Sequence, residues 1–164
     1  MNKKSDYEKN IGKNVVSNNF GVGEIIGVDD LGLKEGLFYV ISHQKKKLKS
    51  YLSITNNPNY RIVTDRESYS KLTSMFDHSK FVAPELEKKE RIAYFKSKSN
   101  SDSLLTLLET ASELSKVKDL APPESSILRS IVSSLSTEHS LIFDSSYEES
   151  QSYIQSLIKG ETNE

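Results

Sequence analysis

The fold of the first part of the chain is decided by residues 12–28, which read GKNVVSNNFGVGEIIGV. Short runs of Val and Ile are broken here by Asn and Gly every few positions. β-Branched side chains pack well on a pleated sheet, whereas Asn and Gly tolerate the positive φ angles of tight turns. The pattern therefore predicts two short strands joined by a turn, over residues 14–17 and 23–29, rather than a helix.

Three more apolar runs extend this pattern to residue 63. They are LFYVI at 37–41, LKSYLSI at 48–54 and YRIV at 60–63. About five short strands in roughly fifty residues correspond to the size of a small, strongly bent barrel. We therefore predict a five-stranded β-barrel at the start of the chain.

Helical signals replace the strand signals after Val63. Capping residues or prolines precede apolar stripes at helical spacing, and they predict helices that begin near residues 64, 85, 102, 122 and 147. We therefore expect an α+β protein of two domains. The β domain is predicted at 1–64, the all-α domain at 65–160 and a disordered tail at 161–164.

Composition argues against several classes of chemistry. The 164 residues include no Cys, which excludes disulfides and thiolate sites. His43, His78 and His139 have no acidic or His partner at metal-ligand spacing, and neither a nucleophile elbow nor a phosphate-binding loop is found. We therefore predict that the protein is not an enzyme and holds no metal or cofactor. Without a signal peptide or a bilayer-length apolar run, it is expected to be cytoplasmic and not membrane-bound.

The formal net charge of −1 hides a gradient along the chain. Residues 1–70 carry a net charge of +3 and residues 71–100 another +3, whereas residues 101–164 carry −7. A polyanion would approach the first hundred residues and avoid the last third. Ordinary variation of surface charge is the competing interpretation.

The motifs follow one another in a recognisable order. GKNVV at 12–16, GVGEI at 21–25, FYVI at 38–41, a Lys-rich strand and YRIV at 60–63 are followed by ERIAYFK at 90–96 and DSLL at 102–105. This order resembles the CarD/CdnL family of bacterial transcription regulators, which begin with a Tudor-like module also found in transcription-repair coupling factors. The resemblance covers residues 7–159 and implies a Tudor-like barrel followed by a helical domain.

The resemblance also implies a docking strand. In CarD-type proteins the fourth strand lies against the RNA polymerase β subunit and adds a strand to its sheet. Here that strand follows KKKLK at 45–49, and strand alternation predicts that Lys47, Lys49 and Tyr51 share one face. Lys49 falls on the family's basic contact position. The alternative interpretation is an edge strand that lysines protect from aggregation.

The helical domain is expected to contact upstream promoter DNA. Lys88, Lys89 and Arg91 fall where the family carries basic residues that touch DNA, and Lys and Arg contacts with phosphates are the usual source of affinity for duplex DNA. Arg129 is the cation that remains on a later helix, along which family members tend to be basic. Interleaved Glu residues make a solvent-exposed, salt-bridged helix the alternative.

One departure from the family concerns the residue before the basic cluster. Better-known CarD proteins carry a Trp there that wedges into the minor groove, but this chain has no Trp and offers Leu86 or Glu87 instead. Leu can act as an apolar wedge between base steps. Leu86 is therefore either a wedge or a core residue, and we favour the core.

The leading hypothesis is a monomeric, non-enzymatic transcription regulator that modulates open-complex formation. It would bind the RNA polymerase β subunit and, weakly and without sequence specificity, upstream promoter DNA. It would thus associate with the nucleoid through the polymerase. The alternatives are a stand-alone DNA-binding protein, and a protein adaptor that does not contact DNA.

Overall fold

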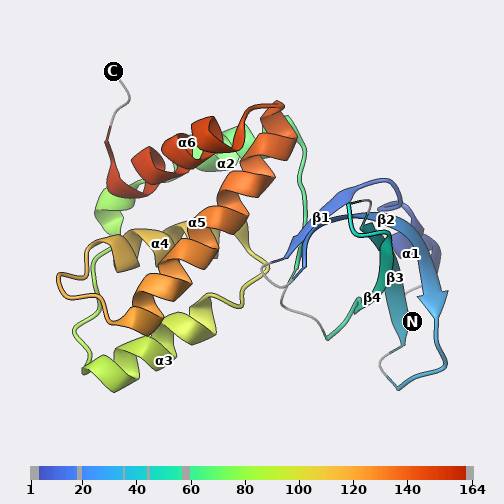
Figure 1. Cartoon of the computed structure of the whole chain (residues 1–164), viewed down its shortest axis with the longest axis horizontal. Helices are drawn as coiled ribbons and strands as arrows, with labels where there is room; N and C mark the ends of the chain where they lie inside the picture. Colours follow the sequence, from blue (N-terminus) through green and yellow to red (C-terminus); the bar gives the residue numbers. More distant parts are fainter. Residues whose placement is uncertain (1–3, 18–19, 35, 44, 57–59, 162–164) are drawn as a thin grey trace. The chain divides into compact units, whose positions relative to one another are not determined.

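A computed structural model of the chain describes residues 4–17, 20–34, 36–43, 45–56 and 60–161. The protein is α+β, with a sheet followed by helices, as the sequence predicts (Figure 1). The chain divides into two compact units, Met1–Val63 and Thr64–Glu164. The tail predicted at 161–164 falls, from residue 162 on, outside the described residues.

The first unit is built on a five-stranded antiparallel sheet with the strand order β4-β3-β2-β1-β5. Its strands lie close to their predicted positions: β1 is Asn14–Ser17, β2 Gly21–Asp30, β3 Leu37–His43, β4 Leu48–Ser53 and β5 Arg61–Ile62. A short helix precedes them, α1 (Lys4–Glu8). The β-branched runs thus form the sheet that their composition predicts.

The sheet is open, so the predicted closed barrel is wrong. β4 and β5 are its two edges, and no ladder joins them within the described part of the chain. The physical reason is the shortness of β5: of its two residues, at most one directs its N–H and C=O groups away from β1, which is too few for a second ladder. A side chain spans the opening instead, because the Tyr60 hydroxyl donates a hydrogen bond of 3.2 Å to the carbonyl of Ser53.

One face of the sheet carries the core of the first unit, which consists of Val15, Ile25, Val28, Tyr39, Ile41 and Leu52. A register shift between Ile25 and Gly27 allows Ile25 and Val28 to be buried on the same face although their spacing is odd. From α1, the Tyr7 ring packs edge-on against Tyr39, with 6.3 Å between the ring centroids. Tyr7 of α1 thus packs against this core.

The second unit is a bundle of helices: α2 (Arg66–Met75), the 3₁₀ turn η1 (His78–Lys80), α3 (Lys88–Lys98), α4 (Leu104–Ser115), α5 (Pro122–Phe143) and α6 (Tyr147–Lys159). Helix α4 supplies the largest share of the buried core through Leu107, Leu108, Ala111 and Leu114. Its apolar residues cover more than one stripe, so α4 contacts α3, α5 and α6.

Helix α3 begins three positions later than its sequence predicts, at Lys88 rather than Glu85. The amide of Leu86 donates a hydrogen bond of 3.0 Å to the carbonyl of Pro84, which turns the backbone tightly before the helix. Glu87 then precedes the helix with an extended backbone. Leu86 therefore lies outside the helix and is 37% exposed, so its favoured assignment to the core is wrong.

A buried histidine joins α5 to α6. The His139 ring stacks on Phe143 and Tyr153, with centroid distances of 4.5 and 4.4 Å, and its Nδ1 lies 2.9 Å from Ser150 Oγ. Burial lowers the pKa of His139 below its usual value of 6.5. The imidazole is therefore neutral at pH 7, which suits an aromatic stack in the bundle.

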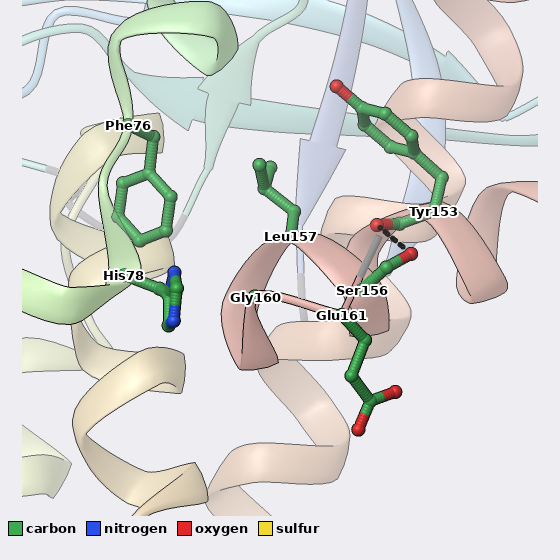
Figure 2. Close-up of a pocket in the computed structure, with 7 residues that line it drawn as sticks. All are labelled: Phe76, His78, Tyr153, Ser156, Leu157, Gly160 and Glu161. Carbon is green, nitrogen blue, oxygen red and sulfur yellow. Dashed lines mark hydrogen bonds between the residues drawn. The ribbon is translucent and has the colours of Figure 1, made fainter. Parts of the chain in front are cut away.

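Helix α6 ends where η1 packs against it. Gly160 caps the helix in the left-handed region with φ +71°, and a methyl group added there would lie 2.0 Å from the His78 ring. Figure 2 shows the His78 ring facing this end of the helix. Glycine thus suits the backbone conformation, and any larger residue at this position would have to displace the His78 ring.

We expect Gly160→Ala to lower the free energy of unfolding of the helical unit by more than the roughly 1–2 kcal/mol that a left-handed L-residue costs. The excess arises from the collision with His78, so the double variant His78→Ala/Gly160→Ala should recover part of the loss. Urea denaturation followed by circular dichroism measures both effects. Gly32→Ala measures the backbone cost alone, on the unfolding of the first unit, because Gly32 has φ +68° but open space around it. Equal losses in the two single variants would contradict the predicted collision.

Candidate functional site

The outer edge of β4 is the first candidate surface. The amide of Ile54 donates a hydrogen bond of 3.1 Å to the carbonyl of Leu37, and β4 pairs with β3 without a register shift. Because hydrogen-bonded and non-hydrogen-bonded pairs alternate in an antiparallel ladder, the backbone groups of Lys49, Tyr51 and Ser53 point away from β3. Lys49 and Tyr51 therefore lie on an edge with outward N–H and C=O groups.

The side chains of this edge strand divide between the two faces of the sheet. Leu52 opposes Tyr39 and is buried, whereas Lys49 opposes Ser42, Tyr51 opposes Val40, and both are exposed. The predicted common face is therefore correct for Lys49 and Tyr51. Leu48, which the sequence did not single out, is 58% exposed and adds an apolar side chain to this edge.

Lys47 does not share that face, which corrects the prediction. It lies in the turn before β4 and has a left-handed backbone with φ +49°. The alternation of side chains between the two faces of a strand therefore does not extend to Lys47. Together with the exposed Lys45 and Lys46, it forms a basic turn at the start of β4.

The loop between β2 and β3 holds two further exposed apolar residues. Leu31 is 40% and Leu33 53% exposed, so neither side chain is buried against the sheet. This loop and the basic turn lie at opposite ends of β3. The two features thus belong to different parts of the unit's surface.

The first turn of α3 is the second candidate surface, and it contains Lys88 and Lys89. Both side chains are exposed, and neither forms an ion pair within the described part of the helical unit. Cations at a helix N-terminus are locally unfavourable, because the helix dipole is positive there. The same dipole and the first amides favour a bound anion. Two lysines at this position are therefore suited to phosphate groups.

Arg91 is directed toward α5 rather than solvent. Its Nε donates to Glu124 Oε1 at 2.5 Å and its Nη2 to Glu124 Oε2 at 3.0 Å. Glu124 is fully buried and also accepts a hydrogen bond of 2.8 Å from the Ala121 amide at the start of α5. The hydrogen bonds from Arg91 lower the pKa of Glu124, and those to Glu124 raise the pKa of Arg91. The charge of Arg91 is thus neutralised within the protein, and we do not include it in the surface proposed for DNA.

We expect Arg91→Ala to lower the urea midpoint of unfolding clearly more than Lys88→Ala or Lys89→Ala. Removing one partner of a buried pair leaves the other charge uncompensated, whereas an exposed lysine contributes little to stability. Chemical denaturation of the three variants at pH 7 checks this order. Equal midpoints would show that the pair does not stabilise the fold.

Arg129 is exposed on α5 and lies next to a cavity between α5 and α6. The structure does not group it with Lys88 and Lys89 on one helix. A second hollow, of about 340 Å³, lies beside the end of α6 and is lined by residues that include His78, Tyr153 and Glu161 (Figure 2). In Figure 2 the Ser156 hydroxyl donates a local hydrogen bond of 3.3 Å to the Tyr153 carbonyl.

The described residues contain neither a candidate metal cluster nor a candidate membrane-spanning helix. No cluster of three or more His, Cys, Asp or Glu side chains among them could hold a metal ion. None of the helices in the described ranges combines the length and the apolar character needed to cross a bilayer.

No family model matches this chain, and a search of curated proteins finds no match either. The resemblance to CarD/CdnL proteins therefore rests on the sequence motifs alone.

Proposed function

We propose that the protein is a non-enzymatic transcription regulator that docks on the RNA polymerase β subunit through β4 and brings the helical unit to upstream promoter DNA. The observation that carries the proposal is the open edge of β4, with outward backbone groups at Lys49 and Tyr51. In this proposal the first unit is an open form of the Tudor-like module. The protein acts as a monomer in the cytoplasm, associated with the nucleoid through the polymerase.

The edge has the properties that strand addition requires. A partner strand gains affinity from backbone hydrogen bonds and specificity from alternate side chains. Here Lys49 supplies a cation and Tyr51, which is 49% exposed, supplies aromatic area on the same face. The basic turn at Lys45, Lys46 and Lys47 adds positive charge that would steer an acidic partner surface. Charged edges also prevent aggregation, so the lysines serve both roles.

The DNA contact is assigned to Lys88 and Lys89, with Leu86 beside them. Two phosphate contacts alone give weak binding, but docking on the polymerase raises their effective concentration at the promoter. Leu86 is exposed and precedes the two lysines in the chain. An exposed apolar side chain at this position is suited to insertion between base steps of the DNA. These contacts would modulate open-complex formation.

A protein adaptor that does not contact DNA is the second candidate function. The observation that favours it is the pairing of Arg91 with Glu124, which removes one cation from the surface of α3. Glu85, Glu87 and Glu90 lie beside the remaining lysines and reduce the local net charge further.

Lys49→Glu should abolish co-purification of the protein with RNA polymerase, because it reverses the charge at the centre of the proposed edge. Affinity purification with tagged full-length protein, followed by quantification of the β subunit, measures the effect. Lys34→Glu makes the same charge change on an exposed residue of the β2–β3 loop and should leave retention unchanged. Equal retention of the two variants would exclude β4 as the docking strand.

We expect Lys88→Gln/Lys89→Gln to weaken promoter DNA binding by the polymerase-bound protein and to reduce its salt dependence. Each lost phosphate contact lowers the slope of log K against log salt by about 0.9. Fluorescence anisotropy with labelled upstream duplex, at several salt concentrations, measures the slope. Lys96→Gln, in the last turn of α3, is the matched control. An unchanged slope together with normal promoter opening would favour the adaptor.

A further inference from the structure

The helical unit contains a cavity that the proposed function does not use. It has a volume of about 600 Å³ and lies between α5 and α6, with the end of α4 and the α4–α5 connection on a third side. Small-molecule sites occupy roughly 300–1,000 Å³. The two helices meet at the turn between Phe143 and Tyr147 (Figure 1). Size alone therefore admits a small organic molecule.

The base of the cavity is apolar. Val132 from α5 and Ile158 from α6 are only 7% and 2% exposed, and Leu128 and Leu120 extend the apolar surface around them. Burying an aliphatic or aromatic body against these side chains would release water from apolar surface, which is favourable. The lining thus selects a ligand that is largely apolar.

The polar part of the lining is cationic. Arg129 projects from α5 and Lys159 from α6, and neither forms an ion pair with another described residue. Among the described residues that line the cavity, none is acidic. A guanidinium binds a carboxylate through two parallel hydrogen bonds, and an ammonium adds a second charge. The free charges therefore select an anionic group on the ligand.

The boundaries of the cavity favour a small molecule over a helix from a partner protein. At one end the Tyr147 hydroxyl donates a hydrogen bond of 3.2 Å to Ser133 Oγ and links α6 to α5. At the other end lie Ser115 and Ser125. The stretch of α5 from Ser125 to Ser133 is about 12 Å long at 1.5 Å per residue. A partner helix would have to continue past both ends, whereas a short molecule would not.

We infer that the cavity between α5 and α6 binds a small amphipathic organic anion, with an apolar body on Leu128, Val132 and Ile158 and a carboxylate held by Arg129 and Lys159. This site is independent of the β4 edge and of the α3 lysines. Because the ligand contacts both α5 and α6 and binds only the folded unit, binding stabilises the helical unit by mass action.

The test uses decanoate as the probe and the full chain as the protein. Isothermal titration calorimetry below the micelle concentration should show saturable binding of one molecule, and the unfolding temperature should rise with decanoate. Decanol, which lacks the charge, and the variant Arg129→Gln/Lys159→Gln should each bind about tenfold more weakly or worse, because a charge-assisted hydrogen bond is lost.

Two further variants separate the site from general effects. Gln155→Trp places a large ring in the cavity from an exposed position on α6 and should block decanoate without disturbing the core. Lys71→Gln/Lys96→Gln removes two exposed charges elsewhere in the unit and should bind like the wild type.

Three outcomes would overturn the inference. The first is the absence of saturable binding, and the second is equal affinity for decanoate and decanol in the wild type and all variants. The third is that decanoate does not bind whereas an acidic amphipathic helical peptide binds tightly. That result would assign the cavity to a protein partner instead.

Discussion

A buried charge constrains the helical unit: the carboxylate of Glu124 needs a partner, which the ion pair with Arg91 supplies. The pair joins α3 to α5, and the same buried carboxylate also receives the amide that begins α5. A fully buried charge is stable only when it is paired and hydrogen-bonded, and Glu124 meets both conditions. This arrangement neutralises the charge of Arg91, so its guanidinium attracts a phosphate less strongly than an unpaired cation would.

The open sheet of the first unit has a corresponding effect on its own surface. In a closed barrel every strand has two neighbours, so a partner strand could be added only by breaking existing hydrogen bonds. Here the outer backbone groups of β4 face away from β3, and the Tyr60 hydroxyl donates a hydrogen bond to the carbonyl of Ser53 at the end of the strand. The open edge of β4, which contradicts the predicted barrel, therefore lowers the free-energy cost of adding a partner strand.

Local signals predicted the local structure well. Val15 and Val16 fall in β1, and Ser146 and Gly160 bound α6, because β-branched residues, caps and glycines act through near neighbours. What the sequence could not predict depends on distant contacts. The pairing of Arg91 joins residues 33 positions apart, and barrel closure depends on how long β5 remains in register with a strand elsewhere in the chain. The cavity beside Arg129 arises from three helices together, so no single segment signals it.

The left-handed backbone of Lys47 has a cost in stability. An L-residue with a long side chain adopts this region at a cost of about 1–2 kcal/mol, which glycine would avoid. The chain thus carries a cation at a position where glycine would have the lower backbone energy. A search for thermostable sequences would favour the removal of this lysine, and the resulting protein would be more robust but less positively charged beside its open edge.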